Sequence, residues 1–320
     1  MAAVLGELVA AAPEGDGALP SGSAPTPGRR VWREMRKSPA VIFSAVFIVL
    51  ISLMAIFAPL VVQLSGWGPF EFDPDAVDAD LGGIPIGPGG GIGADHWFGV
   101  EPGNGRDIFA RIAYGARISL AIAGSATLIT ITLGVVFGML AGFFGGWVDQ
   151  VISRTMDFLM AFPTLIFMIA VLSALPAGNR PFLLVIVLSV FGWPYTARVI
   201  RGQSMSLRNA EFVEAAFASG ATPIRIALRE VLPNLRGTII VLATLSVPSY
   251  IGTEAGLSFL GVGVTPPTPS WGQMIAQAVP WYTTNPMFFV IPGTFLFLTV
   301  LSFTLLGDKL RETLDAGDAA

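Results

Sequence analysis

Residues 118–144 read ISLAIAGSATLITITLGVVFGMLAGFF, a long stretch without a single charged side chain. A helix needs about 20 consecutive, mainly apolar residues to cross the ~30 Å hydrocarbon core of a bilayer. This stretch is therefore long enough to span a membrane. Gly134, Gly138 and Gly142 lie four residues apart and share one helical face, where a second helix can approach closely. The spacing indicates helix packing and identifies no function.

Similar stretches recur along the 320 residues, of which 53% are hydrophobic and only 12% charged. A soluble domain carries about 25% charged residues. We therefore expect an all-α integral membrane protein that crosses the bilayer several times. The six expected transmembrane helices lie at about 40–62, 118–144, 157–176, 182–202, 236–260 and 286–307.

Lysine and arginine concentrate in the cytoplasmic loops of membrane proteins, so their placement predicts the orientation. With the amino terminus inside, the outer loop 63–117 is rich in aspartate and glutamate, and both termini are cytoplasmic. Four of the 18 basic residues then lie outside: Arg106, Arg111, Arg117 and Arg180. The others lie inside: Arg29, Arg30, Arg33, Arg36, Lys37, Arg154, Arg198, Arg201, Arg208, Arg225, Arg229, Arg236, Lys309 and Arg311.

Three segments follow from this topology. Residues 1–38 form a basic cytoplasmic tail, expected to be disordered because its Ala, Gly, Pro and Ser residues bury too little apolar surface. Residues 39–315 form the transmembrane domain. Residues 316–320 form a short cytoplasmic tail.

Several kinds of site are excluded by composition. Zero cysteines exclude disulfides and thiolate metal sites. A phosphate-binding loop, GxxxxGK[ST], is absent because neither Lys37 nor Lys309 follows a glycine. His96 is the only histidine, and metal sites need several ligands, so we expect a surface or structural role. We expect no catalytic site, metal or cofactor on this chain, and no nucleic-acid partner, because the basic residues follow the membrane topology.

The cytoplasmic loop 203–235 is too long for a simple connection between helices of a bundle. Its sequence predicts a helix, a turn and a second helix. Asn209 is the expected N-cap of the first helix, and Gly220 ends it. Thr222 caps the second helix with Pro223 at its first position, and Pro233 ends it. Such an amphipathic pair either docks a partner or lies on anionic lipid, and the spacing leaves both alternatives open.

The same loop carries a recognisable motif. Six of its residues keep a fixed spacing: Glu214, Ala215, Ala216, Gly220, Leu232 and Pro233. In this spacing the loop resembles the EAA signature of ABC-importer permeases, with Glu230 as a departure two positions before Leu232. Two further blocks, 256–275 (GLSFLGVGVTPPTPSWGQMI) and 297–315 (FLTVLSFTLLGDKLRETLD), are similar to the dipeptide, oligopeptide and nickel group. A third block resembles HxFGTD…GRD…R…GxRxSL, with Val100 and Glu101 replacing the usual Thr-Asp.

The resemblance, which is to the second (C-type) permease of that group, implies a specific assembly. It implies a permease, not an enzyme, in the bacterial plasma (inner) membrane, surrounded by lipid. A homologous second permease completes the pathway as a heterodimer. Two ATPase subunits bind ATP and Mg²⁺, and each receives one EAA helix. An extracytoplasmic binding protein delivers di- or oligopeptides; alternatives are nickel chelates, glutathione or related solutes. A side chain at Gly220 is expected to separate the two helices.

Glu254 lies in the fifth expected span, where an ionisable group is costly and usually faces the bundle interior or water. It either binds a local donor near the outer interface or lines the pathway, where it would meet the ammonium group of a peptide. Ser249 and Tyr250 are the other candidate pathway residues. Two other classes of function remain open from the residues alone: an ion-coupled secondary transporter, with paired midplane charges, and a membrane scaffold.

Overall fold

The computed structural model describes residues 38–176 and 178–318. The basic tail expected at 1–38 lies almost wholly outside the described residues. At the other end, helix α14 continues to Asp318, so most of the short tail expected at 316–320 extends the last helix.

Within the described residues, five helical segments are long and apolar enough to cross a membrane. They are α3 (Pro39–Ile56); α6 (Ile108–Met139) with the π-helical turn η2 (Leu140–Phe144); α9 (Arg180–Arg208); α11 (Pro223–Ile226) with the π-helical turn η3 (Ala227–Val231) and α12 (Leu232–Phe259); and α14 (Pro286–Asp318).

The third expected span, 157–176, is wrong as a single straight helix. Two helices, α7 (Gly146–Met160) and α8 (Thr164–Ala174), occupy this region and are bent by 83° relative to each other. The break falls at Pro163, which lacks an N–H and disfavours helical geometry in the residue before it. Eleven residues of α8 extend only about 16 Å, so α7 and α8 reach the length of a span only together.

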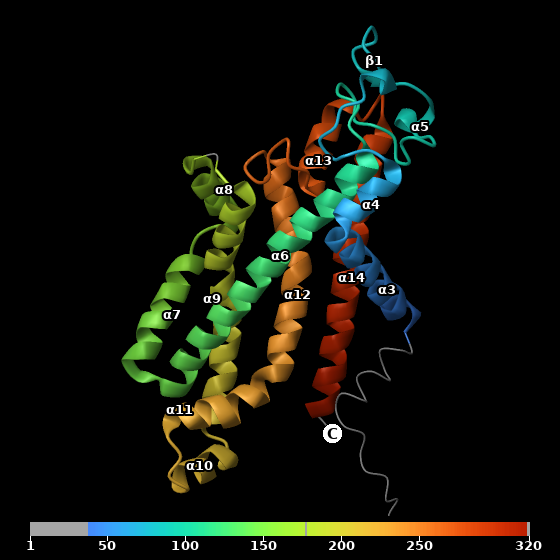
Figure 1. Cartoon of the computed structure of the whole chain (residues 1–320). Coiled ribbons are helices and arrows are strands. Elements are labelled where there is room, and N and C mark those ends of the chain that lie inside the picture. The colour runs from blue at the N-terminus through green and yellow to red at the C-terminus, as the bar shows by residue number, and fades with distance from the viewer. Residues whose placement is uncertain (1–37, 177, 319–320) are drawn as a thin grey trace, which may run out of the picture.

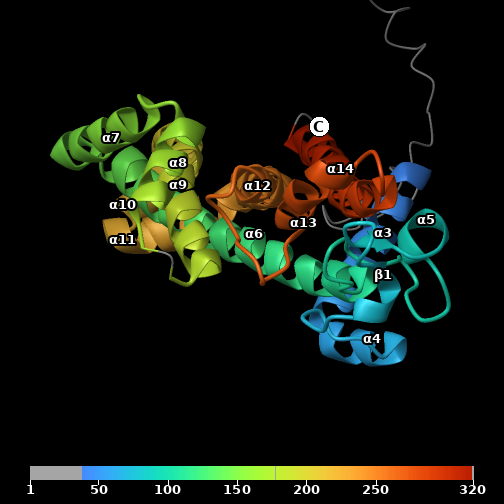
Figure 2. The same cartoon turned by 90° about the horizontal axis from the view of Figure 1, so that it is seen from above.

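The helices form an elongated bundle (Figure 1). One end carries the β-hairpin and α5, and the opposite end carries α10 and α11 together with the end of α14. Helix α6 runs obliquely between the two ends. Seen from above, α7, α8 and α9 lie at one end of α6 (Figure 2). The other end of α6 is surrounded by α3, α4 and α14, and α12 lies between the two groups.

The glycine spacing in α6 produces the close approach that the sequence predicted. The partner is α9. A Cβ atom on Gly134 would lie 2.4 Å from the Thr196 side chain, and one on Gly142 would lie 2.4 Å from the Arg201 carbonyl oxygen. Gly138 meets Ala197 and Ile200 in the same way. Backbone therefore packs on backbone along this interface, as is common between membrane helices.

The expected outer loop is an ordered cap. Helix α4 (Ala58–Ser65), most of which falls in the first expected span, leads into it. The loop itself contains the 3₁₀ turn η1 (Pro74–Ala76), strands β1 (Val77–Asp78) and β2 (Ile84–Pro85), and α5 (Pro88–Gly91). The strands pair antiparallel, with Val77 opposite Pro85. A second short helix, α13 (Trp271–Ala278), and the 3₁₀ turn η4 (Val279–Trp281) follow α12 at the same end.

His96 is buried in this cap, which confirms a structural role and not a surface one. Its Nδ1 lies 2.9 Å from Asp107 and its Nε2 lies 3.1 Å from Asp73. Asp107 also caps α6 by accepting the Ala110 N–H at 2.6 Å. Burial raises the pKa of the Asp107 carboxyl above its ordinary value, while the hydrogen bonds from Ala110 and His96 oppose the shift. The three side chains fasten the cap to the start of α6.

Candidate functional site

The candidate site is the helix pair between α9 and α12. Helix α10 (Glu211–Ala218) begins only two residues after α9 ends. Asn209 is the C-cap of α9 and Ala210 precedes α10, so the expected N-cap at Asn209 is wrong. Thr222 and Pro223 do occupy the N-cap and first position of α11, as expected.

Gly220 forms the turn between the two helices. Its φ is +77°, in the left-handed region that side-chain-bearing residues rarely adopt. The Gly220 N–H donates to the Phe217 carbonyl at 2.9 Å, and the next N–H, of Ala221, donates to Ala216 at 3.1 Å. A Cβ atom on Gly220 would meet nothing within 4 Å. The expectation that a side chain here would push the helices apart is therefore wrong; the backbone angle alone requires glycine.

Pro233 does not end the second helix, contrary to expectation. A continuous helical segment runs from Pro223 to Phe259. The π-helical turn Ala227–Val231 immediately precedes Pro233, and such a local adjustment lets a helix accept a residue without an N–H. The second helix of the pair is therefore the beginning of α12, and any movement of α11 is passed directly to that long helix.

The inner face of the pair is fixed to the bundle. Val213 on α10 and Ile226 on α11 are completely or almost completely buried. They belong to one apolar cluster with Met139 and Phe143 at the end of α6 and η2, and with Ile200 on α9. Because burial of apolar area stabilises by about 25 cal/mol per Å², this cluster holds the pair in one orientation relative to α6 and α9.

The outer face exposes apolar side chains beside charged ones. Phe212, Phe217, Ile224 and Leu228 are all 40% exposed or more. Exposed apolar side chains on a helix pair that also carries exposed charges are typical of a docking surface. The charged residues of the rim, all exposed, are Glu211, Glu214, Arg225 and Arg229.

The EAA residues divide between the two faces. Glu214 and Ala215 are exposed on α10, and Ala216 is half-buried against the inner cluster. Leu232 is likewise half-buried, and Pro233 is exposed at the start of α12. The structure therefore brings the motif together around the Gly220 turn, at the end of the bundle opposite the cap.

The candidate pathway residues do not form one surface. Glu254 is fully buried, and its two oxygens accept hydrogen bonds from Ser119 at 2.8 Å and Ser258 at 2.7 Å. Tyr250 is also buried and donates to Thr130 at 2.9 Å. Ser249 is exposed. Glu254 thus faces the interior, as expected, and has local donors; its contact with a substrate remains a prediction.

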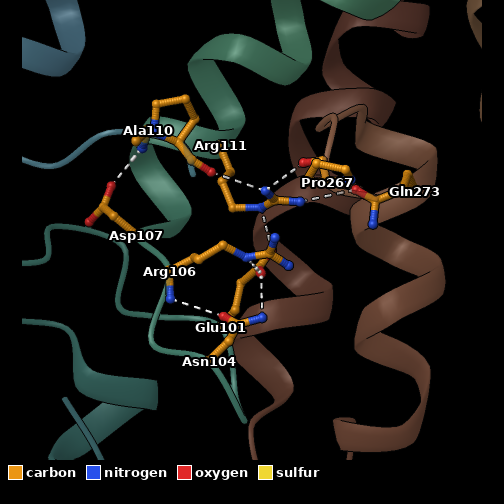
Figure 3. A network of polar contacts seen from close by, with 9 residues as sticks. Glu101, Asn104, Arg106, Asp107, Ala110, Arg111, Pro267 and Gln273 are labelled. Atoms are coloured by element: carbon orange, nitrogen blue, oxygen red, sulfur yellow. Dashed lines mark hydrogen bonds and ion pairs between the residues drawn. The ribbon is translucent and has the colours of Figure 1, made fainter. Parts of the chain in front are cut away.

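The structure also contains a buried ionic centre whose pairing was not predicted from the sequence. Glu101 lies between Arg111 and Arg106, with its two oxygens 2.5 and 2.8 Å from their Nε atoms (Figure 3). Arg111 also donates to the Pro267 carbonyl at 3.2 Å and to Gln273 at 3.1 Å. The centre joins the cap to the segment after α12. The only sequence signal was the GRD block and the arginine four residues after it.

Membrane-length helices, an ordered cap at one end and an exposed helix pair at the other place the chain among multi-pass membrane proteins. Residues 134–316 match the family described as "Binding-protein-dependent transport system inner membrane component", and residues 26–81 match "N-terminal TM domain of oligopeptide transport permease C". The chain belongs to this family of inner-membrane permeases. It is a transport subunit of the ABC-importer type, not an enzyme.

Relatives support the same group. The oligopeptide transport system permease protein OppC of Bacillus subtilis (strain 168) is 36% identical over 290 residues, 89% of either chain. The glutathione transport system permease protein GsiD of Escherichia coli O157:H7 is 37% identical over 290 residues, 91% of this chain and 90% of the relative. The resemblance to C-type permeases of the peptide group is thereby confirmed.

A solved structure shares the fold. The MetNI methionine ABC transporter, in an inward-facing conformation, superposes with a TM-score of 0.52 at 19% identity, covering 63% of this chain and 96% of the other. At this identity the likeness concerns the fold alone.

Proposed function

We propose that the chain forms half of the translocation pathway of an ATP-driven importer for di- and oligopeptides. The observation that carries the proposal is the exposed helix pair, whose second helix continues into α12. An exposed apolar surface that is rigidly joined to a membrane-length helix suits a partner that does mechanical work on the bundle. An ion-coupled transporter has no need of such an element.

We infer the assembly from the family to which the chain belongs. A homologous permease completes the pathway as a heterodimer, and two ATPase subunits on the cytoplasmic side bind ATP and Mg²⁺. Each ATPase receives one helix pair, centred on Glu214 to Gly220. A binding protein delivers substrate to the capped end, and both termini of this chain lie in the cytoplasm.

The physical account of coupling starts at the Gly220 turn. Closure of the ATPases displaces α10 and α11 together, because their inner faces share one apolar cluster with α6 and α9. The continuous helix from Pro223 to Phe259 then tilts, since no flexible joint separates α11 from α12. We propose that this tilt changes the exposure of Ser249 and its neighbours to the pathway. Glu254 and Tyr250 are proposed to keep α12 aligned with α6 through their hydrogen bonds to Ser119 and Thr130.

Peptides and glutathione are the two substrate candidates favoured by relatives. The relatives include an oligopeptide permease and glutathione permeases at nearly equal identity, 36% and 37%. Both substrates are peptide-like, with an ammonium group and a carboxylate. Nickel chelates remain a further alternative.

The test is a reconstituted complex of the two permeases, the two ATPases and the binding protein. We expect ATP hydrolysis to rise when a di- or oligopeptide is added, with glutathione and a nickel chelate as the two competing arms. Stimulation by glutathione alone, or by the nickel chelate alone, would replace the peptide assignment. Failure of the permease to copurify with ATPase subunits would overturn the proposed function as a whole.

A further inference from the structure

An ion pair joins α7 to α9 within the bundle. The Nε and Nη2 atoms of Arg201 lie 2.5 and 2.7 Å from the two oxygens of Asp149. Ser153, one turn further along α7, donates to the same carboxylate at 2.9 Å. Two parallel bonds between a guanidinium and a carboxylate fix orientation as well as distance. A displacement of α9 is therefore passed to α7 in a defined direction.

Arg201 is also a contact point for α6. Its carbonyl oxygen is the atom against which Gly142 packs so closely that a Cβ atom would lie 2.4 Å away. The backbone of Arg201 thus contacts the end of the α6 segment while its side chain holds α7. Two turns further along α9 the helix ends at Arg208, and α10 begins at Glu211. Arg201 is the residue at which three helices meet just before the helix pair.

Few side chains of α7 are buried. Among its residues only Met156 is fully buried. Met156 forms a small apolar cluster with Trp193 and Ala197 of α9. The partly buried side chains packed against this cluster are Ile152 and Leu159 of α7 and Leu133 and Phe137 of α6. Apolar contacts have no directional preference of their own, whereas the bidentate ion pair fixes the position of α7 along α9.

A second ion pair between the same helices serves as an internal comparison. Arg198 and Asp157 share a single hydrogen bond of 2.7 Å, and their side chains are 48% and 55% exposed. The side chains of Arg201 and Asp149 are 28% and 21% exposed. Exposed single-bond pairs contribute little, because solvent screens them and their side chains lose entropy on pairing.

We propose that Arg201 and Asp149 are positioning residues that make the bent α7–α8 unit follow the helix pair during transport. This inference rests on the proposed function, since it assigns a path to the movement that the ATPases impose. The movement enters at α10, reaches Arg201 through the continuous α9, and passes to Asp149 on α7. Helix α8, which follows α7 after the 83° bend, is displaced with it. The α7–α8 unit therefore changes position together with α12.

The test uses the complete complex in liposomes, with the number of substrate molecules transported per ATP hydrolysed as the readout. We expect Asp149→Asn and Arg201→Gln each to lower this ratio about five-fold or more, the lower end of typical coupling free energies. ATP hydrolysis and copurification with the ATPases should persist. The double variant Asp149→Arg with Arg201→Asp, which restores opposite charges in exchanged positions, should recover most of the ratio. Arg198→Gln, which breaks the second ion pair and keeps the Asp157 carboxylate near Arg201, should leave the ratio unchanged.

The outcomes separate the two proposals. If the wild-type complex shows no ATP-driven transport, the proposed function fails. If the wild type couples and Asp149→Asn couples equally well, the inference alone fails. Loss of thermal stability in both single variants, with no recovery of the ratio in the exchanged pair, would also overturn it, because the pair would then be merely structural.

Discussion

Gly220 is the residue whose backbone angle matters most for the proposed docking of the helix pair. Its φ of +77° is unfavourable for any residue with a Cβ, by roughly 1–2 kcal/mol, whereas the space around it is open. We therefore expect Gly220→Ala to weaken the turn and reduce copurification with the ATPases, and Gly220→Asn to be milder because asparagine tolerates the left-handed region better. Affinity purification of the complex, with a thermal melt of the permease, measures both effects.

Gly237 provides the matched control for that prediction. It lies within α12, has ordinary helical geometry, and a Cβ atom there would meet nothing within 4 Å. Gly237→Ala should be neutral or slightly stabilising, because alanine favours a helix by about 1 kcal/mol over glycine. Equal losses at both positions would show that the Gly220 angle is not the limiting feature.

Glu254 gives a second prediction at the same scale. Replacing it with alanine leaves the hydroxyls of Ser119 and Ser258 without their acceptor in a buried site, which costs about 1–3 kcal/mol for each unpaired group. We expect Glu254→Ala to lower the melting temperature of the purified permease. Ser249→Ala, on the exposed side of the same helix, should leave it unchanged.

The conservative change at this position tests the pathway role separately. Glu254→Gln keeps an acceptor oxygen and nearly the same volume. Unchanged peptide uptake by that variant would end the idea that the carboxylate contacts the substrate. Retained stability with lost uptake would favour it.

At the scale of elements, apolar length and glycine spacing were sufficient to predict most of the helices. The residues 118–144 lie in one helical segment, and the glycine face in it does pack closely on a second helix. The bend between α7 and α8 was missed because only part of the bent pair is apolar. Helix α7 is amphipathic and carries Asp149, Arg154 and Asp157, so hydropathy indicated a span only over the end of α7 and the apolar α8. The continuity through Pro233 was missed because proline usually ends a helix, and a π-helical turn leaves no clear signal in a sequence.

The helix pair allows a prediction that compares its two faces. Leu228 and Val231 lie three residues apart, but Leu228 is 57% exposed and Val231 is completely buried in the inner cluster. Leu228→Ser should leave the fold intact and weaken ATPase association, because it removes part of the docking surface. Val231→Ser should lower the melting temperature, because it places an unpaired hydroxyl in an apolar site.

Copurification and thermal melting, measured on both variants, distinguish the faces. If Leu228 lies on the docking surface, Leu228→Ser should weaken ATPase association without lowering the melting temperature. Val231→Ser should lower the melting temperature. If Leu228→Ser binds the ATPases as tightly as the wild type does, the exposed apolar face is not the contact surface.

At the scale of the whole molecule, the sequence predicted the helix pair better than the polar centres. The EAA residues are close in sequence, so their spacing alone locates them. Arg111 instead contacts Pro69, Glu101, Pro267 and Gln273, some of them more than 150 residues away in the chain. No periodicity links such distant segments, and only the folded chain brings them together. Buried charges of this kind persist only when paired, so the centre identifies where the cap must stay fastened.

The distribution of arginine and lysine predicts the orientation of the whole bundle, and this prediction can be tested directly because the chain has no cysteine. Single cysteines at Ala79, an exposed residue of the hairpin connection, and at Ser219, an exposed residue beside the Gly220 turn, mark the two ends of the bundle. In intact spheroplasts a membrane-impermeant maleimide should label Ala79→Cys at once. It should label Ser219→Cys only after the membrane is permeabilised. The reverse pattern would place the helix pair outside, beyond the reach of any cytoplasmic ATPase, and both the orientation and the proposed coupling would then be wrong.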